Sequence, residues 1–159
     1  MKITVIAVGK IKEKYLTDAV AEYMKRLGRY CRLNIIEVAD ERTPDGASEA
    51  VEVGIREREG ERILQKIPDG AYVIALAIDG NAPDSVEFAR QMERWNVDGV
   101  SHMAFLIGGS LGLSSAVLKH ADYRLSFSHM TFPHQLMRVI LLEQIYRSFR
   151  IRNHEPYHK

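Results

Sequence analysis

Two stretches near the end of the chain decide its fold: Phe105-Leu-Ile-Gly-Gly-Ser-Leu-Gly-Leu113 and Leu125-Ser-Phe-Ser-His-Met-Thr-Phe-Pro-His-Gln-Leu-Met-Arg138. Each begins with the short apolar run of a buried strand and then breaks. The first breaks into glycines. The second breaks into a polar loop and then a helix, which we expect to start at Pro133, because proline suits the first helical position. Loops that leave neighbouring strands at one sheet edge commonly form a small-molecule pocket. We therefore predict a ligand pocket, built largely of backbone groups, between these loops.

Strands and helices alternate along the rest of the chain. Apolar runs predict strands over Ile3–Val8, Leu33–Val38, Ala71–Ile78, Met103–Ile107 and Tyr123–Ser128. Helical spacing and capping residues predict helices over 13–28, 48–66, 84–95, 114–121 and 133–151. We expect the second helix to break near Gly60, and Asp79-Gly80 to end the third strand, which is apolar on both faces and so central. The alternation predicts an α/β fold: a Rossmann-like, mostly parallel sheet of five or six strands with helices on both faces.

Size and composition restrict the class of protein. The chain has 159 residues, of which 46% are hydrophobic and 27% charged, and it is predicted to form one domain over residues 1–159. No apolar stretch is long enough to span a membrane, so we expect no membrane partner. Its start reads as a first strand rather than a signal peptide. Cys31 is the single cysteine, which excludes an internal disulfide and favours a cytoplasmic location.

Charge is uneven along a chain whose formal net charge is only +1. Residues 10–32 carry seven Lys or Arg and three acids, whereas residues 40–62 carry eight acids and four Arg. Segregation of this kind can give a nearly neutral protein a basic face for RNA. The same pattern equally fits helix faces that are simply solvated, so charge alone does not decide between the two interpretations.

The last predicted helix is apolar nearly all round. One apolar face would cover the sheet of its own chain, and the other requires a second cover. In a chain this small we expect that cover to be a second copy, and therefore predict a homodimer.

The two decisive stretches resemble the SPOUT methyltransferases, a family with an α/β trefoil knot. The resemblance covers the whole chain and is carried by Ile107–Gly109, by Ser128–Gln135 and by the C-terminal Tyr157–Lys159. It is strongest to members that methylate N3 of a pseudouridine in 23S rRNA, the large-subunit rRNA. Two positions depart from the pattern: His129 stands where Lys is expected, and Lys159 where many members end in Arg. The resemblance, not the periodicity, implies a C-terminal trefoil knot.

For the cofactor, the resemblance implies S-adenosylmethionine (SAM). It places the cofactor-binding residues at the ends of three strands: Leu76, Gly108, Gly109, Phe127, Ser128, His129, Met130, Thr131 and Phe132. Taken without the resemblance, the glycines could be an ordinary strand-to-helix turn that needs positive φ. They do not have the spacing of the dinucleotide fingerprint.

For catalysis, the implied acceptor N3 carries a proton that must leave before methyl transfer, which calls for a base or an anion stabiliser. The resemblance points to the C-terminal tail, with His158 as the base and Tyr157 and Lys159 beside it. His134, Arg138 and His154 are predicted to contact the substrate. The tail could instead be frayed, and His134 could cap its own helix. The histidines show no metal-ligand spacing, and no metal is expected.

The leading interpretation is therefore a SAM-dependent rRNA (pseudouridine-N3-)methyltransferase that acts on 23S rRNA within the assembled ribosome. Two alternatives stay open: a related knot enzyme that acts on tRNA, and a ribosome-associated binding protein without catalysis.

Overall fold

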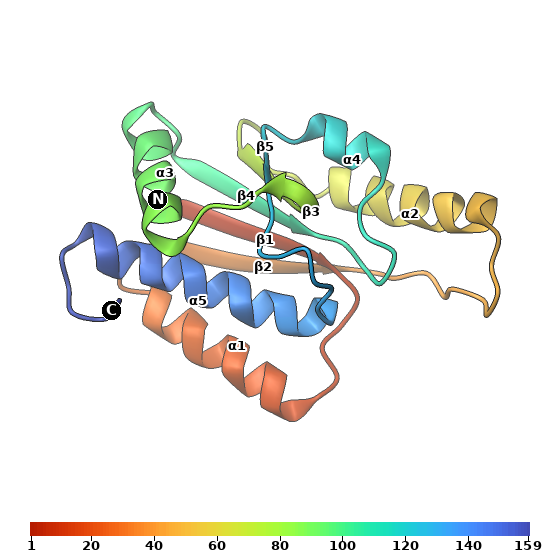
Figure 1. Cartoon of the computed structure of the whole chain (residues 1–159), viewed down its shortest axis with the longest axis horizontal. Coiled ribbons are helices and arrows are strands. Elements are labelled where there is room, and N and C mark those ends of the chain that lie inside the picture. The colour runs from red at the N-terminus through yellow and green to blue at the C-terminus, as the bar shows by residue number, and fades with distance from the viewer.

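A computed structural model describes residues 1–159 and contains ten regular elements (Figure 1). The strands are β1 (Lys2–Val8), β2 (Arg32–Val38), β3 (Tyr72–Asn81), β4 (His102–Ile107) and β5 (Tyr123–Leu125). The helices are α1 (Lys14–Leu27), α2 (Glu49–Leu64), α3 (Ser85–Val97), α4 (Ser115–His120) and α5 (His134–Arg152). All ten predicted elements are present. The predicted capping box of α3 is confirmed, with Glu87 N–H donating to Asp84 and Asp84 N–H donating to Glu87, both at 2.8 Å.

The five strands form one sheet in the order β2-β1-β4-β3-β5, and every pairing is parallel. This confirms the predicted fold class. It corrects the expectation that the two decisive loops leave neighbouring strands, because β3 lies between β4 and β5. The expectation that Ala71–Ile78 forms an inner strand is confirmed, because β3 pairs with β4 on one side and with β5 on the other.

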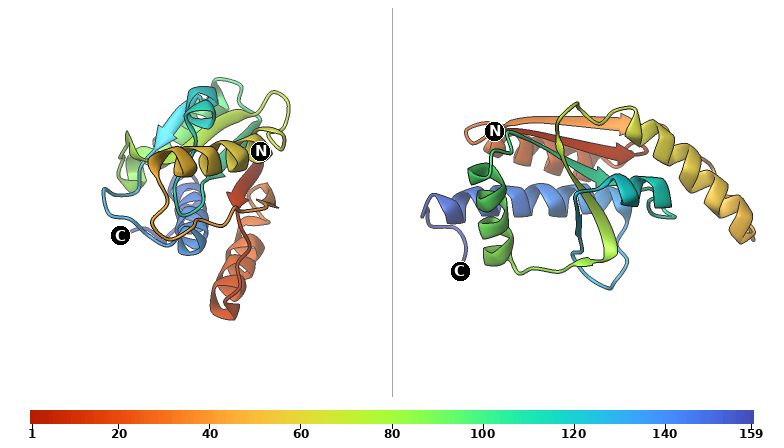
Figure 2. Two further views of the ribbon diagram at one scale, coloured as in Figure 1. Left: turned by 90° about the vertical axis from the view of Figure 1, so that its right-hand side faces the viewer. Right: turned by 90° about the horizontal axis from the view of Figure 1, so that it is seen from above.

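Helices cover both faces of the sheet (Figures 1 and 2). Helices α1, α3 and α5 lie together on one face, where the larger core contains Leu27, Phe88, Met92, Leu141 and Ile145. Helices α2 and α4 cover the other face, with Ile63 and Val117 in a smaller core. Each such side chain contributes about 1.5–3 kcal/mol through its burial. Side chains point alternately to the two covered faces along β1 and β4, which explains why residues 3–8 and 103–107 are apolar except for Thr4.

Gly60 does not break α2, so that prediction is wrong. Instead the glycine lets two helices approach closely. A Cβ at Gly60 would lie 2.4 Å from Ser114 Oγ, and Ser114 is the N-cap of α4, accepting the Val117 N–H at 3.3 Å. The residue is needed for packing between α2 and α4, a role that the local sequence does not reveal.

Strand β3 continues past the expected turn at Asp79-Gly80 to Asn81. Both Leu76 and Asn81 pair with Leu125 of β5, so the residues between them form a bulge. A Cβ at Gly80 would lie 2.8 Å from the Arg124 carbonyl, and glycine permits that approach. Strand β5 ends at Leu125, three residues earlier than predicted. Helix α5 begins at His134, with Pro133 as its N-cap rather than its first residue.

None of the helices has the length and apolarity needed to cross a bilayer. No three His, Cys, Asp or Glu side chains come together as a ligand set for a metal ion. The trefoil knot stays a prediction from the family resemblance.

Candidate functional site

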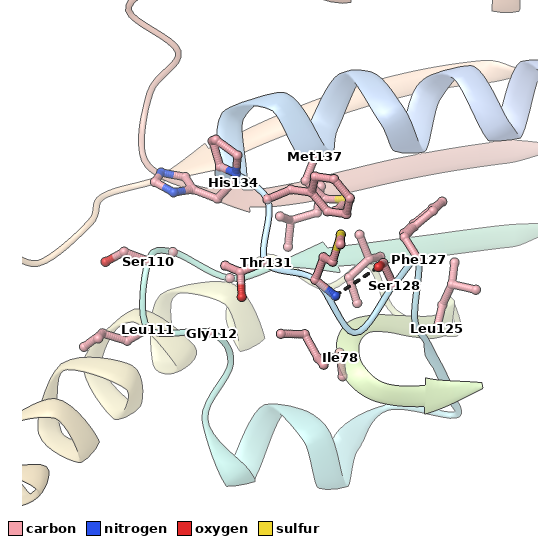
Figure 3. A pocket seen from close by; sticks show the side chains of 18 residues that line it. Ile78, Ser110, Leu111, Gly112, Leu125, Phe127, Ser128, Thr131, His134 and Met137 are labelled. Atoms are coloured by element: carbon pink, nitrogen blue, oxygen red, sulfur yellow. Dashed lines mark hydrogen bonds between the residues drawn. The ribbon is translucent and has the colours of Figure 1, made fainter. Parts of the chain in front are cut away.

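A cavity of about 610 Å³ opens at the C-terminal edge of the sheet, where β3, β4 and β5 end (Figure 3). Three segments and the start of α5 line it: Leu76–Ile78, Ile107–Gly112, Leu125 with Phe127–Ser128, and Met130–His134 with Met137. Eight of the nine predicted cofactor-binding residues are among them. His129 is the exception, because its exposed side chain lies outside the lining.

Several lining residues were not predicted. Ala77 and Ile78 enter because β3 lies between β4 and β5 and bulges at this point. Met137 enters because the first turn of α5 faces the cavity (Figure 3). No local motif marks these positions, which depend on strand order and helix placement. Ser110 and Leu111 also line the cavity, and the first quoted stretch, which contains both residues, could have suggested them.

The lining is mostly apolar, and His134 is its single titratable side chain. The polar groups that remain are largely backbone ones. The N–H groups of Ser110 and Leu111 donate no hydrogen bond within the chain. A site of this kind suits a flat, heteroaromatic ligand whose faces pack on apolar side chains and whose edge meets backbone groups.

The geometry of the glycine loop, residues 108–112, itself requires Gly108. A Cβ at Gly108 would lie 2.6 Å from the carbonyl carbon of Gly112, inside van der Waals contact. Gly112 has φ +82°, and its N–H donates to the Gly109 carbonyl at 3.0 Å, which closes the turn. Close approach of two backbone segments, rather than of a ligand, therefore requires glycine at position 108.

Side-chain hydroxyls hold the second loop in place. Ser126 Oγ donates to the Ile78 carbonyl at 2.8 Å, which ties the loop to the β3 bulge. Ser128 Oγ accepts the Met130 N–H at 2.9 Å (Figure 3). These bonds leave Met130 and Thr131 exposed at the rim, and Met130 exposes 73% of its surface.

His134 stands half-buried at the mouth of the cavity (Figure 3). It does not cap α5, since the N-cap is Pro133 and no side chain caps the helix. Burial lowers the pKa of His134, and the Arg138 charge lowers it further, while Asp40 opposes both. The imidazole is therefore neutral near pH 7 and able to accept a proton.

Arg138 does not face the cavity or the solvent, contrary to the prediction that it contacts the substrate. Its side chain is 2% exposed and is held by Glu37 Oε2 at 2.6 Å and by the carbonyls of Val8 and Gly9 at 3.2 and 2.6 Å. The periodicity of α5 could not reveal this role, because the partners come from β1 and β2.

The tail lies at the far end of α5 from the cavity (Figures 1 and 2). Helix α5 has 19 residues, which gives it a length of roughly 28 Å. Hence the structure does not bring His154, Tyr157, His158 or Lys159 to the cavity of their own chain. His154, just beyond the helix, is exposed and has φ 55°.

Tyr157 anchors this tail. Its hydroxyl donates to Glu143 at 3.0 Å, its ring meets Tyr146 edge-on at 5.1 Å, and the Arg147 guanidinium lies 4.7 Å from the ring centre. Burial, followed by the Glu143 bond, raises the pKa of Tyr157 to about 12, so the phenol is protonated at neutral pH. His158 is exposed, with Nδ1 3.1 Å from Arg147.

Known proteins are similar to this chain over its full length. Residues 1–158 match the family described as "Predicted SPOUT methyltransferase". Proteins named "Ribosomal RNA large subunit methyltransferase H" from Bifidobacterium adolescentis and Clostridium kluyveri are 62% and 61% identical, over 100% of both chains in each case. A solved structure of a putative Legionella pneumophila methyltransferase, in complex with the bound cofactor SAM, is 12% identical to this chain. The match covers 94% of this chain and 66% of that one. Its TM-score of 0.52 shows a shared fold. The full-length match, together with the cavity at the ends of β3, β4 and β5, establishes that this chain belongs to the SPOUT methyltransferase family.

Proposed function

We propose that this protein transfers a methyl group from SAM to N3 of a pseudouridine in 23S rRNA, on the assembled ribosome in the cytoplasm. The observation that carries the proposal is the cavity of about 610 Å³, built from the strand-end segments in which the family motifs lie. The names of the full-length relatives support the substrate class, large-subunit rRNA.

The residues of the cavity fit SAM. Leu76, Phe127 and Phe132 offer apolar surface for an adenine ring, and the free N–H groups of Ser110 and Leu111 offer donors for its polar groups. When bound, SAM supplies a methyl group that is already activated by its sulfonium charge. The protein then has to hold the acceptor base in line with that group and exclude water, which is catalysis mainly by positioning.

The acceptor nitrogen must also lose its proton, and two histidines are candidates for the base. His134 lines the cavity of the same chain and is neutral near pH 7. His158 stands on a tail that points away from that cavity, so it serves only if it reaches the cavity of a partner chain. We propose a homodimer that brings the tail of one chain to the other, with His158 as the base and Lys159 stabilising the acceptor anion.

The dimer would use the side of α5 that its own chain leaves uncovered. Leu136 is 36% exposed on the first turn of α5, and Ile140 one turn later is half-buried. Sedimentation of the wild-type protein at micromolar concentration should show a dimer. Leu136→Asp should give monomers, and Val97→Asp, which changes a 77% exposed residue at the end of α3, should not. A wild-type monomer at that concentration would contradict the arrangement.

The decisive test of function is the rRNA itself. Mass spectrometry of 23S rRNA from a strain that lacks this protein should show one pseudouridine without its N3 methyl group, and the restored protein should return it. Titration of the purified protein with SAM in a calorimeter should show binding. Binding without any missing methyl group would favour action on tRNA, and no binding would favour a protein without catalysis.

A further inference from the structure

Glu59 is an acidic residue buried directly behind the cavity without lining it. It belongs to α2, and its side chain is only 4% exposed. One carboxylate oxygen, Oε2, accepts the Glu41 N–H at 2.9 Å. The other oxygen, Oε1, is buried and has no hydrogen-bond partner. A buried, unpaired carboxylate oxygen is costly, so it calls for an explanation.

The residue in front of Oε1 is Gly109, in the glycine loop that lines the cavity. A Cβ at Gly109 would lie 3.2 Å from Glu59 Oε1 and 3.4 Å from Oε2. The N–H group of Ser110, in this same loop, donates no hydrogen bond within the chain, whereas Gly109 is bridged to Gly112. A buried acceptor without a donor therefore lies against the loop that contains a donor without an acceptor.

We infer that Glu59 is a positioning residue for cofactor binding: when SAM binds, Glu59 Oε1 accepts the Ser110 N–H and fixes the glycine loop against the ligand. The identity of the ligand rests on the proposed function. N–H bonds to both oxygens favour the ionised carboxylate over the acid, so a Glu59 that is protonated in the free protein gives its proton to the solvent as the complex forms. No other bond is made or broken.

The charges around Glu59 agree with this linkage. Burial raises the pKa of Glu59 in the free protein, Asp40 and Glu41 add to the effect through their charges, and the Glu41 N–H and Arg62 oppose it. A new N–H bond to the ionised form lowers that pKa in the complex. Because the complex holds fewer protons than the free protein, the affinity for SAM should rise with pH through the range in which Glu59 titrates, by at most about tenfold per pH unit.

Calorimetric titration with SAM in two buffers of different ionisation enthalpy measures the protons released on binding. Wild-type protein should release a fraction of a proton, largest near the pKa of Glu59. Glu59→Gln keeps the shape and an acceptor oxygen but cannot titrate, so the release should fall and the affinity should lose that part of its pH dependence. Glu57→Gln, which changes an exposed acid on the same helix, is the matched control and should behave as wild type. His134 also titrates beside the cavity, so the difference between wild type and Glu59→Gln assigns the proton.

A second variant leaves Glu59 in place. Gly109→Ala puts a methyl group 3.2 Å from Oε1 and from Val8 Cγ1, which obstructs the bond, and it should also reduce the release. This variant decides the matter if Glu59→Gln does not fold. Equal proton release by wild type and the folded variants, with SAM bound, would overturn the role of Glu59 and leave the proposed function intact. Absence of SAM binding by the wild type would overturn the proposed function itself.

Discussion

Arg138 on α5 and Glu37 on β2 form an ion pair, with 2.6 Å between Nη1 and Oε2, at the edge of the sheet that carries the cavity. The same guanidinium binds the carbonyls of Val8 and Gly9, and the same carboxylate accepts the Ile11 N–H at 3.3 Å. One buried arginine thereby fixes the start of α5, and with it His134, relative to the end of β1.

We expect Arg138→Ala to destabilise the fold by about 1–3 kcal/mol, because it leaves the carbonyls of Val8 and Gly9 without their donor, while water can still reach the 38% exposed Glu37. Glu37→Gln keeps an acceptor oxygen and should cost less. Urea unfolding followed by circular dichroism measures both. A stable Arg138→Ala protein that has lost only its affinity for RNA would instead restore the sequence-based prediction that Arg138 contacts the substrate.

The cavity should respond differently to two substitutions. Gly108→Ala crowds the Gly112 backbone, so it should lower both the melting temperature and the affinity for SAM. Thr131→Trp adds bulk to an exposed side chain of the rim and should weaken SAM binding by well over tenfold, about 1.4 kcal/mol or more, with the melting temperature unchanged. Calorimetry and thermal unfolding test the pair. Full affinity in Thr131→Trp would exclude this rim from the cofactor site.

Deletion of residues 157–159 should leave SAM affinity nearly unchanged, because the cavity is built by the strand-end segments and the start of α5. Methyl transfer to ribosomes should fall by roughly a hundredfold, as expected for the loss of a proton-transfer group. His158→Ala should reproduce much of that loss in single-turnover assays at saturating SAM, and Tyr157→Phe, which keeps the ring packed on Tyr146, should not. A full rate in the truncated protein would leave His134 as the base.

Cys31 should be inert in the folded protein. Burial raises the pKa of its thiol to about 11, so almost none of the reactive thiolate is present at neutral pH. A thiol reagent should modify Cys31 only on unfolding. Because folding favours the protonated thiol, the residue's contribution to stability should be lost as the pH rises through about 11, and Cys31→Ala should reduce this alkaline loss. Rapid modification at pH 7 would contradict the burial.

The sequence was sufficient to predict the helices and strands, because the signals for them are local. Two-sided apolar runs predicted β1 and β4, and Asp84 with Glu87 predicted the start of α3. The chain does not encode strand order in the same way. The position of β3 between β4 and β5 depends on packing, and this position brings Ile78 into the cavity.

The errors about Arg138 and Gly60 have the same origin, because the partners of both residues are distant in the sequence. Arg138 looked like a surface residue beside His134, because its partners in β1 and β2 lie about 100 or more positions away in the sequence. Gly60 looked like a helix breaker, because Ser114 approaches it only in the folded chain. The family motifs located the strand-end loops well, since a backbone pocket needs a specific local sequence, but they did not show that the tail and the cavity lie at opposite ends of α5.

Because the tail and the cavity lie at opposite ends of α5, the proposed catalysis can be tested by genetic complementation. If each cavity is served by the tail of the other chain, a Thr131→Trp chain with its tail and a tail-deleted chain with its cavity are both inactive alone. Mixed and allowed to exchange subunits, they form heterodimers that contain one complete active site, and random pairing restores about a quarter of the wild-type activity. Two defective copies would then sustain methylation together in one cell.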